Sequence, residues 1–282
     1  MRTAAGPMGV LLLGLVAVAC GNGDDGSAGG TTTTTASTTT SGSGTGGDTA
    51  GAGGTTGSGG TADGGSGGGS AGAGGGEPLD GYGDLSGMCG DIDLEDVELP
   101  SPELLENLLD FTGSPAFDPA LLSPGGQQMY ADGNLGGSSL YSEIFAYEVL
   151  WRCDGAELLK SEAEIVYAIE GKKTDLLVQI DGEKVGVSVV RAESYPEGAD
   201  YPVSQAYDVL FGKLADILQS SVNVAPEDAW KKQILAVMAQ TPAHADAIEQ
   251  AYAMVDAATK ADTIVLVTVT EGDDAFLYYN QP

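Results

Sequence analysis

The stretch DLLVQIDGEKVGVSVVR, residues 175–191, decides the fold of this chain. Residues 175–180 and 185–191 are dominated by aliphatic and β-branched side chains, which favour extended strands. Asp181 and Gly182 stand between them, and an Asp-Gly pair is a preferred sequence for a two-residue hairpin loop. The sequence therefore predicts two antiparallel strands joined by a tight turn.

The sequence predicts further helices and strands on both sides of this hairpin. Apolar residues recur at helical spacing over residues 138–153, with Ser138 or Ser139 as the cap, and they alternate as in a strand over residues 162–169. Beyond the hairpin, proline positions and hydrophobic periodicity predict three helices, followed by two strands. The three helices are expected over residues 205–219, over residues 226–240, and from Pro242, with Thr241 as the cap of the third. The two strands are expected over residues 263–270 and, as an edge strand, over residues 275–279.

The order helix, three strands, helices, strand predicts an α/β (α+β) fold. It resembles the αβββαβ restriction-endonuclease-like core of the PD-(D/E)xK nuclease superfamily, here over residues 138–270 and with extra helices. The resemblance implies an acidic residue on the first helix, an Asp on the second strand and a (D/E)xK triplet on the third. In such enzymes the carboxylates hold Mg²⁺, and the Lys orients or activates the attacking water.

Only part of that implied site is present in this sequence. Glu148, with Glu143 as second choice, lies on the first helix, Asp175 opens the second strand, and Arg191 aligns with the Lys. Val189 then stands at the acidic position, and a valine side chain cannot coordinate a cation. Moving the register to Ser188 places Val190 where the Lys belongs.

Each of these residues also has a purely structural interpretation. Glu148 could lie on the solvated face of its helix, Asp175 could simply begin a strand, and Arg191 could pair with a nearby carboxylate. His244, three residues past Thr241, is expected to be an exposed residue in the first turn of its helix. We expect no cofactor, apart from the Mg²⁺ that an active nuclease site of Glu148, Asp175 and Arg191 would need.

The N-terminal residues predict export and a lipid anchor. The apolar run VLLLGLVAVA, residues 10–19, is half as long as the roughly 20 residues that cross a bilayer, and it suits a signal peptide over residues 1–19. The sequence AVAC that ends at Cys20 resembles the lipobox of bacterial lipoproteins. This resemblance implies acylation of Cys20 and a location at the cell envelope, at the outer membrane or cell surface. A secretory signal without lipidation is the alternative.

The next segment, residues 20–78, is expected to be a disordered linker. It consists largely of Gly, Ser, Thr, Ala and Asp, and such a composition cannot bury enough apolar surface to offset its conformational entropy. As a flexible coil it would separate its ends by about 40 Å. Residues 79–137 are expected to form an extended acidic arm with one short helix over residues 102–109, ahead of an α/β domain over residues 138–282.

Charge and cysteine content limit the classes of partner. Ten of the 11 basic and 36 of the 41 acidic residues follow residue 77, which gives this region a net charge of −26. A field of this sign repels phosphate backbones, so a nucleic-acid partner is not expected. Because Cys89 and Cys153 lie in a chain expected to be exported, we predict that they form a disulfide; a nucleophilic cysteine is the alternative.

These expectations together describe a membrane-anchored, exported lipoprotein. It would present a non-catalytic, nuclease-like domain for a binding or structural role, to a protein or ligand that the sequence does not name. Two other functions stay open. One is an active metal-dependent nuclease, and the other is an extracytoplasmic ligand-binding lipoprotein of unrelated fold.

Overall fold

A computed structural model describes residues 78–135, 138–196 and 198–279. Contacts divide the chain into two units, Met1–Gly65 and Ser66–Pro282, and all of the described residues belong to the second. The expected signal peptide, Cys20 and most of the linker lie outside the described residues. In the part that is described, no helix is both long and apolar enough to cross a membrane.

One sheet of seven strands organises the described residues, in the order β1-β2-β7-β6-β5-β4-β3. Strands β2, β7, β6 and β5 run parallel, while β1 at one edge and β4 and β3 at the other pair antiparallel. The bounds are Asp84–Gly87 (β1), Glu103–Asp110 (β2), Glu157–Ser161 (β3), Leu176–Ile180 (β4), Glu183–Ala192 (β5), Lys232–Ala239 (β6) and Ile264–Glu271 (β7).

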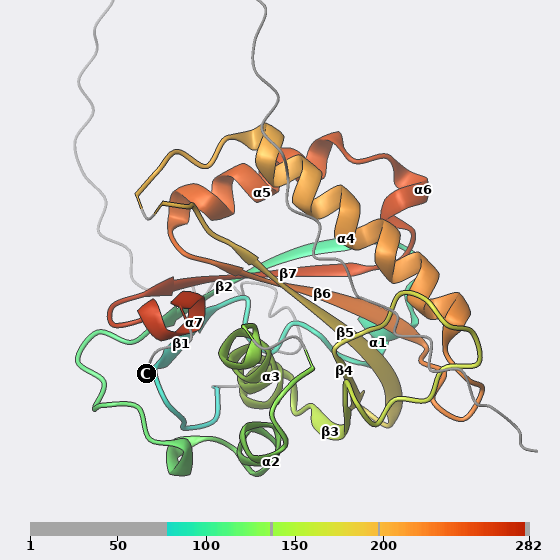
Figure 1. Cartoon of the computed structure of the whole chain (residues 1–282), viewed down its shortest axis with the longest axis horizontal. Helices are drawn as coiled ribbons and strands as arrows, with labels where there is room; N and C mark the ends of the chain where they lie inside the picture. The colour runs from blue at the N-terminus through green and yellow to red at the C-terminus, as the bar shows by residue number, and fades with distance from the viewer. Residues whose placement is uncertain (1–77, 136–137, 197, 280–282) are drawn as a thin grey trace, which may run out of the picture. The chain divides into compact units, whose positions relative to one another are not determined.

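Helices cover both faces of this sheet, with α4, α5 and α6 on one side and α2, α3 and α7 on the other (Figure 1). Their bounds are Leu94–Glu98 (α1), Pro124–Asp132 (α2), Leu140–Asp154 (α3), Val203–Asn223 (α4), Pro242–Met254 (α5), Ala257–Lys260 (α6) and Ala275–Tyr279 (α7). A sheet covered on both faces requires central strands that are apolar nearly throughout, and β6 and β7 satisfy this requirement.

Successive residues of a central strand enter two different hydrophobic cores. In β7, Ile264 and Leu266 belong to the core beneath α3, whereas Val265 and Val267 belong to the core beneath α4 and α5. This division follows from the two-residue period of a strand, which sends neighbouring side chains to opposite faces. The apolar faces of the helices on each side of the sheet pack into the core on that side.

The hairpin predicted from residues 175–191 is confirmed. Strands β4 and β5 pair antiparallel, and Ile180 lies opposite Glu183 across the two-residue turn. Asp181 and Gly182 have φ values of 48° and 89°, as a turn with two left-handed residues requires. The helices predicted over residues 138–153 and 205–219 and from Pro242 are also present as α3, α4 and α5, and the strand predicted over residues 263–270 is β7.

The strand predicted over residues 162–169 is wrong, because β3 ends at Ser161. The side chain of Glu164 accepts hydrogen bonds from Ser161 N (3.0 Å) and Ser161 Oγ (3.2 Å), which turns the chain out of the sheet. The loop that follows is held instead by the segment after α4, where Ala225 N donates to Val166 O (2.9 Å).

The helices predicted over residues 102–109 and 226–240 are also wrong, because strands lie there. Residues Glu103–Asp110 form β2 and residues Lys232–Ala239 form β6, both paired in parallel with β7. Every residue of β6 is buried between the two helical layers. Pairing with distant strands overrides local helix propensity here, since propensity is only a weak preference that tertiary context overcomes.

The last predicted strand, over residues 275–279, is also wrong, because these residues form α7. Phe276, Leu277 and Tyr278 are all buried in the core beneath α3. Three adjacent buried residues suit a short helix packed against another helix, and they conflict with the alternation of a half-exposed edge strand.

Residues 79–137, for which we expected an extended acidic arm, contribute strands β1 and β2 to the sheet. Leu109 and Phe111 of this segment are 1% and 0% exposed in the core beneath α3. The segment is therefore part of the same folded body as α3, and it is covalently joined to α3 through Cys89 and Cys153.

Candidate functional site

Asp175 lies immediately before β4, beside the C-terminal half of β5. Its backbone N donates to Val187 O (3.1 Å), and its Oδ2 accepts from Val189 N (2.7 Å). Desolvation raises the pKa of Asp175 to about 7; Lys213 lowers it, and Glu143 and Glu162 raise it. The register of the β4–β5 hairpin places this carboxyl group opposite the middle of β5, level with Leu235 in the middle of β6.

Three further charged residues, from three different elements, surround Asp175. Glu143 of α3 is 5% exposed and accepts a hydrogen bond from Asn134 Nδ2 (3.1 Å). Glu162 follows β3, and desolvation and the charge of Glu143 raise its pKa. Lys213 of α4 lowers the pKa of both Asp175 and Glu162. We call Glu143, Glu162, Asp175 and Lys213 the acidic cluster.

Two small hollows flank the acidic cluster. The first, about 80 Å³, contains Glu143 and Glu162 in its lining, together with Asn134, Leu140 and Leu176. The second, about 230 Å³, lies between α3, β5 and α4, and its lining includes Ser139, Ser142, Val189, Arg191, Glu193 and Lys213. Both hollows are smaller than the ordinary size of a site for a drug-sized ligand, roughly 300–1,000 Å³.

Arg191 lines the second hollow, and its guanidinium group is already engaged with other groups of the protein. Nη1 donates to Tyr278 O (2.6 Å) at the end of α7, and Nε lies 3.4 Å from Glu193 Oε1. Arg191 thus lies beside a nearby carboxylate, as expected if its role is structural. No hydrogen bond or ion pair among the described residues joins it to Asp175.

Glu148 lies away from the acidic cluster, against the start of α2. It is 2% exposed, and its Oε1 accepts hydrogen bonds from Ser123 N (3.0 Å) and Ser123 Oγ (2.6 Å). Ser123 in turn caps α2, since its Oγ accepts from Gly126 N (3.0 Å). Desolvation raises the pKa of Glu148, and the hydrogen bonds from Ser123 oppose this shift. Its Oε2 is buried and has no hydrogen-bond partner among the described residues.

The acid of α3 that lies near Asp175 is thus Glu143, the second choice, and Glu148 is not on a solvated face. Five residues along a helix correspond to a rotation of about 140°, so the two side chains point to different surroundings. The sequence shows both on one helix, and only the packing of α2 against α3 distinguishes them.

The acidic cluster does not fit the magnesium site that the resemblance implies. Asp175 Oδ2 already accepts the amide proton of Val189, and Val189 supplies no carboxylate from β5. Among the described residues, no group of three or more His, Cys, Asp or Glu side chains is close enough to hold a metal ion. Glu143, Glu162 and Asp175 therefore do not form a set of metal ligands.

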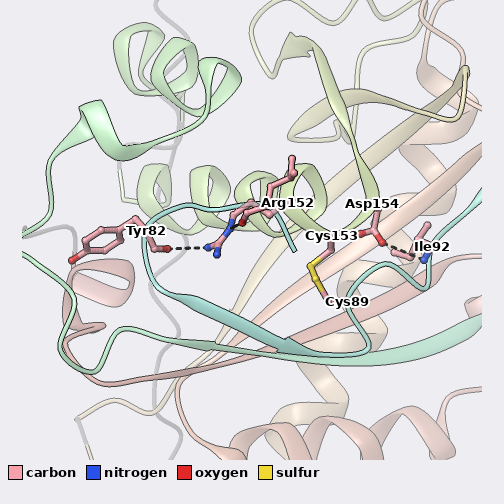
Figure 2. Close-up of a disulfide and its surroundings, with 7 residues drawn as sticks. Tyr82, Cys89, Ile92, Arg152, Cys153 and Asp154 are labelled. Carbon is pink, nitrogen blue, oxygen red and sulfur yellow. Dashed lines mark hydrogen bonds between the residues drawn. A yellow bond between two sulfur atoms is a disulfide. The ribbon is translucent and has the colours of Figure 1, made fainter. Parts of the chain in front are cut away.

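The predicted disulfide between Cys89 and Cys153 is confirmed, with the two Cα atoms 4.8 Å apart. Figure 2 shows that the residues beside Cys153 also hold the N-terminal segment. Arg152 Nε donates to Leu79 O (2.7 Å), and its Nη1 donates to Tyr82 O (3.2 Å). Asp154 Oδ1 accepts from Ile92 N (3.2 Å), and desolvation raises the pKa of Asp154 to about 7.

His244 is 7% exposed, so the expectation of an exposed first-turn residue is wrong. Its Nε2 lies 2.8 Å from Ser194 Oγ and its Nδ1 lies 2.5 Å from Thr241 Oγ1. No local signal in the sequence predicts this chain of contacts, because Ser194 is 50 residues away from His244. Ser194 is itself only 3% exposed, so the chain fixes the end of β5 to α5 and does not present a nucleophile. Burial also lowers the pKa of His244.

Comparison with known proteins shows no family for this chain. No family model matches it, and no solved structure matches it. One curated protein, the AAC-rich mRNA clone AAC4 protein of Dictyostelium discoideum, is 37% identical over 185 residues, which is 64% of this chain and 25% of that protein. The match thus spans about a quarter of that protein's length, and its printed name states no activity.

Proposed function

We propose that this protein is an exported, lipid-anchored envelope protein whose folded part is a nuclease-like domain that binds and does not cleave. The order α3-β3-β4-β5-α4-β6 agrees with the αβββαβ pattern, with β3, β4 and β5 as an antiparallel meander and β6 parallel to β5. This agreement supports the likeness in topology, and the chemistry of the acidic cluster supports the lack of cleavage.

The hydrogen bond from Val189 N to Asp175 Oδ2 (2.7 Å) is the observation that carries the proposal. In the nuclease superfamily, a carboxylate from the third strand and one from the second hold the cation together. Here the third strand offers a backbone N–H at that point, and a cation would lose a ligand while competing with an amide proton. The net charge of −26 after residue 77 also opposes the approach of a polynucleotide.

A nuclease assay on the chain from residue 21 to residue 282 tests this proposal. We expect no cleavage of DNA or RNA with Mg²⁺ or Mn²⁺ at neutral pH. Asp175→Ala is the diagnostic variant, and Asp208→Ala, at an exposed acid of α4, is the matched control. Metal-dependent cleavage that disappears in Asp175→Ala and persists in Asp208→Ala would establish the active-nuclease alternative.

The anchor is tested separately, because it depends on residues outside the described structure. The Cys89–Cys153 disulfide supports an oxidising compartment, where such bonds persist. Two or more acyl chains on Cys20 would hold the protein stably at a membrane surface. We expect Cys20→Ser to release the protein from the membrane fraction and to abolish incorporation of labelled fatty acid. A wild-type chain that incorporates no label would rule the anchor out.

A further inference from the structure

An open groove lies where α1 meets the turn between β4 and β5. It has a volume of about 540 Å³, and its lining includes the apolar residues Leu94, Leu99 and Pro100. This volume is within the ordinary range for a ligand site, roughly 300–1,000 Å³. Leu94 begins α1 and is 42% exposed. We call this hollow the α1 groove.

The other residues that line the α1 groove are all acidic. They are Asp93, Glu95, Glu98 and Asp181. A second hollow, of about 480 Å³, shares Asp93 and Glu95 with the groove and adds three more acids to the lining, which are Asp91, Asp96 and Glu103. The two hollows thus adjoin, and together they carry seven acidic side chains. Among the described residues, no Lys or Arg lines either of them.

Hydrogen bonds hold the α1 groove in a fixed shape. Lys232 is 2% exposed, and its Nζ donates to three backbone oxygens at and after the end of α1. These are Asp96 O (2.6 Å), Leu99 O (2.8 Å) and Ser101 O (3.3 Å). At the start of the helix, Leu94 N donates to Asp181 Oδ2 (3.1 Å), which joins α1 to the β4–β5 turn. A partner would therefore meet a surface that is already formed, which lowers the entropic cost of binding.

Neighbouring lysines do not neutralise the charge of this surface. No ion pair among the described residues includes one of the seven lining acids. Lys232 is buried among backbone oxygens, Lys231 precedes it in the chain, and Lys184 Nζ donates to Glu227 O (2.5 Å). Even if all three lysines are counted against the seven acids, an excess of four negative charges remains. The surface therefore has the same sign as the region after residue 77, which carries −26.

We propose that the α1 groove binds a basic, partly apolar peptide segment of a partner protein. The acidic side chains would attract its lysines or arginines, and an apolar side chain of the segment would pack against Leu94, Leu99 and Pro100. Two adjoining hollows suit a run of several residues better than a single small cation. The inference rests on the proposed binding role of the domain and adds the class of partner. It depends on neither the anchor nor the absence of cleavage, so the tests of those two proposals are separate from its own.

Isothermal titration calorimetry with the chain from residue 21 to residue 282 tests this inference. The probe is a short synthetic peptide in which lysine and leucine alternate. In one control peptide serine replaces every leucine, and in the other glutamate replaces every lysine. We expect the probe to bind, with an affinity that falls as salt is added. The serine peptide should bind about fivefold more weakly or less, because it loses the apolar contact, and the glutamate peptide should not bind.

Two changes in the α1 groove separate its apolar and acidic contributions. We expect Leu94→Ser to weaken binding of the probe by about fivefold, the value of a partly buried apolar side chain. Glu95→Gln combined with Glu98→Gln should also weaken it by about fivefold, as for two exposed charge pairs. Thermal unfolding of each variant shows whether it is folded, and the double variant keeps the test decisive if Leu94→Ser is not.

Matched changes on α5 control for the general charge and stickiness of the domain. This helix covers the face of the sheet opposite to the core that holds Val97 of α1. Met254→Ser changes an exposed apolar side chain there, and Asp246→Asn combined with Glu249→Gln removes two exposed acids. We expect both of these variants to bind the probe as the wild type does.

Several outcomes would overturn the proposal for the α1 groove. These are the absence of probe binding, equal affinity for the probe and the serine peptide, and equal losses in the variants of α1 and of α5. A dimer of the chain alone that Leu94→Ser dissociates would also overturn it, because the groove would then be a contact between two copies of the chain.

Discussion

Asp154 and Asp175 are the two residues whose surroundings most affect how stability depends on pH. Desolvation raises the pKa of each to about 7 from the ordinary value of 3.8. The folded protein therefore holds protons that the unfolded chain releases, and folding is favoured when those protons are bound. The stability from these two groups is fully present below about pH 4 and is lost as the pH rises to about 7.

Asp175→Asn should remove the contribution of Asp175 to this pH dependence of the unfolding free energy. We expect the unfolding free energy of the wild type, minus that of the variant, to fall steadily between about pH 4 and pH 7. Urea denaturation at several pH values measures this difference, and Asp208→Asn at an exposed acid of α4 serves as the control. Curves for the wild type and Asp175→Asn that run parallel through this range would show that Asp175 titrates normally.

Glu148 also has a measurable structural role, because it depends on Ser123 for the hydrogen bonds of its buried carboxylate. Ser123→Ala removes one of those bonds and the cap of α2, and should lower the unfolding free energy by about 2–4 kcal/mol. Adding Glu148→Gln should restore about 1 kcal/mol or more, since a neutral amide is easier to leave buried than a carboxylate. Strictly additive effects in the double variant would contradict this coupling.

Among the elements, the β4–β5 hairpin depends most directly on local backbone geometry. Gly182 has φ of +89°, and no atom outside the turn lies within 4 Å of the position of an added Cβ. Gly182→Ala therefore changes backbone energy alone and should lower the unfolding free energy by about 1 kcal/mol.

Gly212→Ala is the matched control for the hairpin substitution. Gly212 lies within α4, and it too has no atom within 4 Å of an added Cβ. The same chemical change should here raise the unfolding free energy by about 0.5–1 kcal/mol, because alanine favours a helix. Chemical denaturation measures both effects, and a loss of stability in both variants would mean that the change in side chain, not the turn, is responsible.

At the scale of the whole molecule, the disulfide joins two parts of the chain that are 64 residues apart. Cys89→Ala combined with Cys153→Ala should lower the unfolding free energy by about 4 kcal/mol, mainly because the unfolded chain gains freedom. The contacts of Arg152 and Asp154 to the N-terminal segment stay in place, so we expect an unchanged circular dichroism spectrum at low temperature. Treating the wild type with a reductant should give the same loss, and equal stability before and after reduction would contradict it.

The sequence by itself determined the elements whose signals are local. Each of these signals involves residues that are close together in sequence. They are the Asp181-Gly182 turn, the spacing of apolar residues in α3 and α4, and the Thr241-Pro242 start of α5, and each of the elements that they predict is present. Composition and charge likewise follow directly from the residues. The pairing of Cys89 with Cys153 could be predicted because only two cysteines remain after residue 20.

Only the tertiary structure decided where β2 and β6 belong and which acid lies near Asp175. Residues 103–110 become a strand because they pair with the whole of β7, and residues 232–239 because they lie between β5 and β7. Hydrogen bonding with a distant strand has no local signal. Glu143 and Glu148 occupy one helix, and the packing of α2 places one beside Asp175 and the other beneath Ser123. The loop between β3 and β4 likewise meets the end of α4 only in the folded chain, where Ile169 N donates to Asn223 O although the two residues are 54 apart in sequence.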